Sequence, residues 1–233
     1  MGRMGAAQRR KNRRRRIPIN TNNPYHRGAG LYELNLALPL ISRIRRQEAR
    51  AVENLIQRHA HSGRTALEVG PGTGFYTLML ARAFREVVAV EDSPRMAQIL
   101  KRKLAAANLR NVTVVNHEFL ALPLDDRFDV AIAIGVLDYI ADPAQFVAKM
   151  CGAARRAVIV TAPQRGMWGT CFRAGGRLRK TAVYCHDRRA PIAWAPGWRC
   201  SVTEVGLNSR VTRGLTLVVT LEPAQVGVSV RTP

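Results

Sequence analysis

The sequence lacks a long run of apolar residues. No stretch of about 18 uninterrupted apolar residues occurs in the chain, and Asp129 interrupts the longest apolar run, at 128–137. A helix that crosses a membrane is therefore not expected. The N-terminus also lacks the apolar segment of a secretory signal, because basic residues lead directly into Ile17. We therefore expect a cytoplasmic protein, with peripheral association at a membrane left open.

Closely spaced cysteines are absent too. The four cysteines are Cys151, Cys171, Cys185 and Cys200, and no two of them form a C-x-x-C pair. Structural zinc sites use such close ligand pairs, so no metal site is expected. Reduced and mostly buried thiols are the simpler interpretation of these residues.

Acidic residues are scarce. The chain has 16 of them against 37 Lys and Arg, which gives a formal net charge of +21. The first acid is Glu33, and residues 1–16 carry eight cations. A field of this sign attracts polyanions, either RNA or DNA or an anionic membrane surface. A solvated tail on an arginine-rich protein is the alternative.

Composition and periodicity divide the chain into three segments. Residues 1–30 contain a charge run and then turn-forming Pro, Asn and Gly, so we expect a basic flexible arm. Residues 31–63 carry apolar residues at helical spacing, with Pro39 as a point of division and Gly63 as a C-terminal cap. Residues 64–233 form the third segment, in which the aromatic-rich stretch 164–198 is a candidate substrate lid.

Strands and helices alternate in the third segment. Apolar runs of strand length lie at 65–69, 87–91, 112–116, 128–134 and 156–161, and two further strands are expected within 198–221. Helical patterns lie at 75–84, 94–107 and 142–151. Alternation of this kind implies parallel strands joined by right-handed crossovers, and hence an α/β layered sheet.

A glycine-rich turn follows the first strand. Gly70, Gly72 and Gly74 lie where the strand passes into the first helix. Glycine lets the backbone approach a ligand without a Cβ atom in the way, and the helix start offers free N–H groups. Ligands of open α/β sheets also bind at the carboxyl ends of the strands.

The second strand ends in an acid. Glu91 comes 21 residues after Gly70, and a carboxylate there can accept hydrogen bonds from two ribose hydroxyls. Dinucleotide-binding enzymes share this device, but Phe75 stands here in place of their third glycine. A helix-capping acid is the alternative role of Glu91.

Four short segments carry a resemblance to a known family: 67–74, 90–96, 117–123 and 128–139. In this order they resemble the four cofactor-binding motifs of the class I S-adenosylmethionine-dependent methyltransferases. The match covers roughly residues 64–162 in register. The resemblance implies a Rossmann-like fold, with a seven-stranded, mostly parallel sheet, an antiparallel last strand and helices on both faces. It also implies that residues 64–233 are the catalytic domain and that S-adenosyl-L-methionine is the cofactor.

The resemblance further implies roles for individual residues. Those that would bind the cofactor are Glu68, Gly70, Gly72, Gly74, Glu91, Glu118, Phe119, Ile134 and Gly135. Glu68 would lie near the amino group of the methionine part, Glu91 would hold the ribose, and Glu118 would contact the adenine. The family commonly has Gly-Asp where this chain has His117-Glu118, so the adenine contact departs from the usual pattern.

Three functions remain open at this point. The stretch 135–140 is similar to methyltransferases of quinones, lipids and secondary metabolites, which favours a small-molecule or lipid-like substrate. The excess of cations favours RNA, but no N-P-P-Y or D-P-P-Y motif follows the strand at 128–134. A non-catalytic cofactor-binding protein is the third. Methyl transfer needs mainly in-line positioning of the acceptor, so no catalytic residue is assigned.

Overall fold

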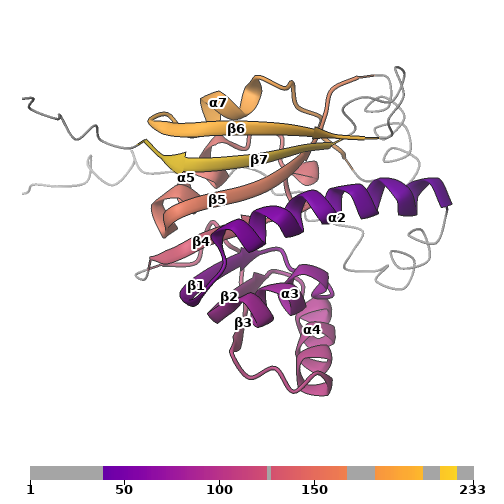
Figure 1. Cartoon of the computed structure of the whole chain (residues 1–233), viewed down its shortest axis with the longest axis vertical. Helices are drawn as coiled ribbons and strands as arrows, with labels where there is room; N and C mark the ends of the chain where they lie inside the picture. The colour runs from indigo at the N-terminus through magenta and orange to yellow at the C-terminus, as the bar shows by residue number, and fades with distance from the viewer. Residues whose placement is uncertain (1–38, 125–126, 167–181, 207–215, 225–233) are drawn as a thin grey trace, which may run out of the picture.

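The computed structural model describes residues 39–124, 127–166, 182–206 and 216–224. Seven strands form one sheet in the order β3-β2-β1-β4-β5-β7-β6. The strands are β1 (His61–Val69), β2 (Phe84–Glu91), β3 (Val112–Asn116), β4 (Phe128–Ala133), β5 (Ala154–Pro163), β6 (Trp198–Val205) and β7 (Thr216–Pro223). The helices are α2 (Pro39–His59), α3 (Phe75–Ala83), α4 (Pro94–Ala106), α5 (Ala144–Ala153), α7 (Ala190–Trp194) and the 3₁₀ turn η2 (Leu137–Tyr139). Figure 1 shows the sheet with these helices packed around it.

The first five strands run parallel, and α3, α4 and α5 connect β1 to β2, β2 to β3 and β4 to β5, where the sequence predicts helices. β1 pairs with β2 on one side and with β4 on the other, and β5 continues the sheet beyond β4. β7 is antiparallel to both of its neighbours and lies between β5 and β6. The predicted seven-stranded, mostly parallel sheet with an antiparallel last strand is confirmed.

Alternate residues of the strands face two apolar layers. Val130, Ile132 and Ile159 pack with Val52 and Ile56 of α2 on one face. Leu67, Ala131, Val158 and Val160 belong to the layer on the other face. Helices cover the sheet on both faces, so its strands are buried on both sides. This burial explains their nearly continuous apolar sequences.

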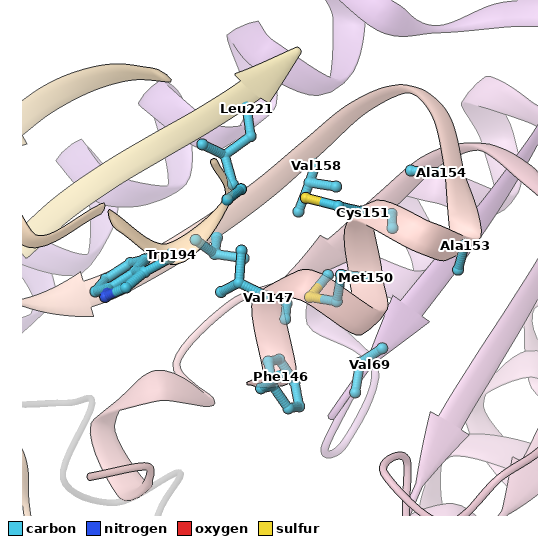
Figure 2. Close-up of a cluster of buried hydrophobic side chains, with 14 of the residues drawn as sticks. Val69, Phe146, Val147, Met150, Cys151, Ala153, Ala154, Val158, Trp194 and Leu221 are labelled. Atoms are coloured by element: carbon cyan, nitrogen blue, oxygen red, sulfur yellow. The ribbon is translucent and has the colours of Figure 1, made fainter. Parts of the chain in front are cut away.

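Figure 2 shows the second layer, where α5 and α7 supply the side chains that cover the sheet. Phe146, Val147 and Met150 extend from α5, and Trp194 of α7 packs in the same cluster as Leu221 of β7. Trp194 is buried, with its ring edge against His186. Its aromatic bulk therefore stabilises the core.

Two local predictions at the start of the sheet are wrong. Residues 61–63 belong to β1, where His61 pairs with Phe84, instead of ending the preceding helix. Gly63 is not among the glycines with positive φ, so it does not cap α2 in the left-handed conformation. The guanidinium of Arg64 takes that place by donating to the carbonyl oxygen of His59 (2.6 Å). Pro39 is the first residue of α2, and the residues before it lie outside the described ranges, so the predicted division at Pro39 stays a prediction.

Several sequence features fall partly outside the described residues. The arm at 1–30, the centre of the stretch 164–198 and the turn between β6 and β7 lie there. Within the described ranges, Cys151, Cys185 and Cys200 form no disulfide, and no cluster of three or more metal-ligating side chains occurs. None of the described helices has the length and apolar character needed to span a membrane.

Candidate cofactor site

A cavity of about 550 Å³ lies at the carboxyl ends of β1, β2, β3 and β4. This volume is within the range of small-molecule and cofactor sites, about 300–1,000 Å³. Nine of its lining residues are those expected from the sequence: Glu68, Gly70, Gly72, Gly74, Glu91, Glu118, Phe119, Ile134 and Gly135. The fold thus brings together residues that are up to 67 positions apart in the sequence, from Glu68 to Gly135.

The glycines of the turn after β1 differ in what they do. Gly72 has a left-handed φ of +56°, and a Cβ atom there would meet nothing within 4 Å, so its backbone is open to the cavity. Gly74 begins α3 with φ of +90°, and a Cβ atom there would collide with Leu100 Cδ1. Gly72 therefore suits the close approach of a ligand, whereas Gly74 is required by packing.

The carboxylate of Glu91 connects this turn to the end of β2. The N–H of Gly72 donates to Oε2 and the N–H of Ser93 donates to Oε1, both at 2.9 Å. Each oxygen keeps a second lone pair for a ligand hydroxyl. Burial raises the pKa of Glu91 to about 7, and the N–H groups of Ser93 and Gly72 act in the opposite direction. Capping of α4 belongs to Ser93, whose hydroxyl accepts from the N–H of Met96.

Glu68 is a second buried acid in the same cavity. Its side chain is 3% exposed, and its Oε2 has no hydrogen-bond partner within the described part of the chain. Burial raises the pKa of this carboxyl to about 7, the Thr77 hydroxyl lowers it, and the charge of Glu91 raises it further. An unpaired buried oxygen is costly unless a ligand satisfies it, so Glu68 suits a cationic or hydrogen-bond-donating group.

The loop after β3 is held from behind by α5. The ammonium group of Lys149 donates to the carbonyl oxygens of Phe119, Leu120 and Leu122, at 2.6, 3.0 and 2.5 Å. It also lies 4.9 Å from the centre of the Phe119 ring, which packs edge-on against Phe146. Phe119 is therefore both a core residue and a wall of the cavity, while Glu118 is exposed at its mouth.

The loop after β4 is held by a threonine. The N–H of Gly135 donates to Oγ1 of Thr161 on β5, at 2.8 Å. Gly135 has φ of +71°, and a Cβ atom there would meet nothing within 4 Å. The backbone of residues 134–136 is thereby fixed along the cavity wall.

Comparison with known proteins agrees with this geometry. A family model described as "Methyltransferase domain" matches residues 67–160. Over residues 67–160 the chain is thus similar to a methyltransferase domain. S-adenosylmethionine is the cofactor of this domain.

The relatives of the methyltransferase domain include enzymes that are named for different substrates. Demethylmenaquinone methyltransferase of Shouchella clausii is 34% identical over 108 residues, which cover 44% of this chain and 46% of the relative. Ribosomal RNA small subunit methyltransferase A of Desulforapulum autotrophicum is 39% identical over 75 residues, covering 31% and 26%. The chain therefore matches about a quarter to a half of the length of these curated relatives.

A solved structure shares the fold over most of the chain. Magnesium protoporphyrin IX methyltransferase from Synechocystis PCC 6803 with bound SAH (S-adenosylhomocysteine) superposes with a TM-score of 0.65 at 16% identity. The match covers 86% of this chain and 96% of that one. At this identity the likeness establishes the fold alone.

The cavity of the methyltransferase domain fits S-adenosylmethionine chemically. The cofactor carries positive charge on its sulfonium and on its amino group, and the cavity holds two buried carboxyls, Glu68 and Glu91. The open backbone at Gly72 and the unpaired Oε2 of Glu68 are further features that a ligand would fill.

Part of the cavity wall was not predicted from the sequence. Arg46 and Ala49 of α2 and Phe75 and Tyr76 of α3 line this part, next to residues 138–140 of η2 and the loop after it. Phe75 is 61% exposed, which is unusual for a large apolar side chain. The described residues of the stretch 164–198 contribute nothing to the lining, so a lid there stays a prediction.

Proposed function

We propose that this protein is an S-adenosylmethionine-dependent methyltransferase that acts on a small-molecule or lipid-like substrate by direct in-line methyl transfer. The observation that carries the proposal is the aromatic and apolar wall beside the two acids, formed by Phe75, Tyr76, Tyr139 and Ile140. Such a wall suits an acceptor with apolar bulk. The demethylmenaquinone methyltransferase and the magnesium protoporphyrin IX methyltransferase are named for acceptors of this kind.

The nine residues at the strand ends are proposed to hold the cofactor. Glu91 would accept hydrogen bonds from the ribose hydroxyls with the lone pairs that its two N–H partners leave free. Glu68 would lie against the amino group of the methionine part. Glu118 and Phe119 would flank the adenine, with Ile134 and Gly135 at the methionine end. The glycines of the turn would pass beside the cofactor, with Gly72 closest to it.

Methyl transfer requires little chemistry from the residues of the protein itself. The sulfonium of the bound cofactor supplies a methyl group that is already activated. The residues of the cavity must then orient an acceptor and exclude water from it. Asp138, Tyr139 and His117 are polar groups on this wall, and no base is assigned among them. A base is needed only if the acceptor must lose a proton.

RNA is the second candidate substrate. The ribosomal RNA methyltransferase relatives and the charge of +21 favour it. Against it, β4 is followed by Gly135-Val136-Leu137 where amino-group base methyltransferases usually carry N-P-P-Y or D-P-P-Y.

A transfer assay separates these candidates. The purified protein should bind S-adenosylmethionine with a micromolar dissociation constant, about 8 kcal/mol, in calorimetry. With tritiated cofactor and a cell extract, label should enter the lipid or small-molecule pool. Label confined to RNA would replace the proposal with the second candidate. Binding without label in any pool would make the protein a non-catalytic cofactor binder.

The two raised pKa values predict a pH-dependent affinity. In the ligand-free protein, burial raises the pKa of Glu68 and Glu91 to about 7. The folded protein therefore favours the protonated acids, and the free energy of unfolding that their protonation contributes is lost as the pH rises through 7. A cationic ligand favours the ionised acids, so affinity for S-adenosylmethionine should rise about tenfold per coupled acid from about pH 6 to about pH 8. The Glu68→Gln variant should show a flatter profile. A profile that is flat in the unmodified protein would remove Glu68 from the site.

A further inference from the structure

We infer that the edge of the sheet opposite the cavity is a docking surface for the phosphate backbone of nucleic acid. Each of five neighbouring parallel strands carries an arginine within its first four residues or within the two residues before it, and together these form a row. The arginine row comprises Arg110 at β3, Arg85 at β2, Arg64 at β1, Arg127 at β4, and Arg155 and Arg156 at β5. This surface is separate from the proposed methyl-transfer site, and the inference does not depend on that function.

Strand register places the row at one level of the sheet. Thr65 pairs with Glu86, and Val87 pairs with Val112, so Arg64, Arg85 and Arg110 lie beside one another just before these pairs. On the other side, Phe128 pairs with Ala154, next to Arg127 and Arg155. With strands about 4.8 Å apart, four intervals extend the row over about 19 Å.

Three members of the row are free to bind a ligand. The side chains of Arg85, Arg110 and Arg155 are exposed and make no hydrogen bond or ion pair with any other described residue. The remaining members are anchored. Arg64 and Arg127 donate to the carbonyl oxygens of His59 and Ala154, and Arg156 pairs with Asp129 at 3.3 Å. The anchored members fix the surface, and the free members supply unpaired charge.

The charge at this edge is positive after its acids are counted. Within the described ranges, the acids among the strand starts are Glu86 and Asp129, against six arginines. Asp125 and Asp126 precede Arg127 and lie outside those ranges, which still leaves six arginines against four acids. Exposed Arg58 and Arg82, in the last turns of α2 and α3, add to the same edge.

The composition of the row favours nucleic acid over a lipid surface. All its cations are arginine, whose planar guanidinium can donate two parallel hydrogen bonds to one phosphate. Folded surfaces that bind membranes usually add apolar side chains that enter the interface. The large apolar side chains exposed in the described residues are Phe75 and Ile192, and neither belongs to a strand of the row.

The test compares two triple variants of the full chain. One removes the free members of the row by Arg85→Gln, Arg110→Gln and Arg155→Gln. The control removes three exposed arginines elsewhere, by Arg95→Gln, Arg102→Gln and Arg189→Gln. Binding of a fluorescein-labelled RNA hairpin, and of a DNA duplex of equal length, is measured by anisotropy across a KCl series.

The row variant should bind the nucleic acid at least about tenfold more weakly. The slope of the logarithm of its binding constant against the logarithm of the KCl concentration should become shallower by about 2–3. The control should change both by less, and SAH affinity should be equal in all three proteins, which shows that they are folded. Equal losses in the two variants would overturn the inference, because charge alone would explain them. Binding to phosphatidylserine vesicles with none to either nucleic acid would overturn it as well.

Discussion

Replacement of Glu91 by alanine should weaken SAH binding by at least about tenfold, since each charge-assisted hydrogen bond is worth about 1.5–3 kcal/mol. The substitution removes the acceptor for the N–H groups of Gly72 and Ser93, both 2.9 Å away, and the proposed acceptor for the ribose. The turn after β1 would then lose its tie to β2. Calorimetric titration with SAH measures the effect.

A second variant keeps this test decisive if the alanine protein is unstable. Glu91→Gln retains one acceptor oxygen for a backbone N–H while removing the charge, so it should fold and still bind SAH more weakly. Glu86→Ala, on the same strand but exposed, is the matched control and should leave the affinity unchanged. If Glu91→Ala folds with the original affinity, the role of Glu91 is restricted to holding the turn.

The Lys149→Met variant should lower the free energy of unfolding by about 2–4 kcal/mol, because three carbonyl oxygens lose a charged donor at once. Lys149 is half-buried, and burial lowers its pKa. Methionine has similar length, so the change removes the hydrogen bonds without opening a large cavity. Urea unfolding followed by circular dichroism measures the loss.

The same variant should also weaken SAH binding, although Lys149 does not line the cavity. It holds the backbone of residues 119–122, and Phe119 and Leu120 form part of the cavity wall. Lys101→Met, on the exposed side of α4, controls for the loss of one positive charge. Unchanged stability and affinity in Lys149→Met would show that the loop holds its conformation without this residue.

The parts of the fold that could be predicted are those that depend on the local spacing of apolar residues in the sequence. The strand 112–116 was predicted at its observed bounds, and the helical pattern at 94–107 agrees with α4 (Pro94–Ala106) to within one residue. The strand ends converge at one edge of any parallel sheet, so residues such as Glu68 and Glu91 could be placed in one cavity before their contacts were known.

The parts that could not be predicted depend on contacts between distant segments. Lys149 lies 30 residues from Phe119, and nothing in the sequence around either residue indicates the other. Arg46 reaches the cavity only because of the direction in which α2 crosses the sheet (Figure 1). The early start of β1 likewise depends on its pairing with Phe84, a residue of another strand.

The position of β7 has a consequence for how the chain folds during synthesis. β5 is complete at Pro163, yet its neighbour β7, which lies between β5 and β6 in Figure 1, begins only at Thr216. At about 5–20 residues per second, ribosomes need several seconds to make the intervening chain. During that time the apolar strand 157–162 presents an unpaired edge, which is a template for aggregation. Slower translation of residues 164–216 should therefore increase the fraction of nascent chains that a cell's chaperones must hold.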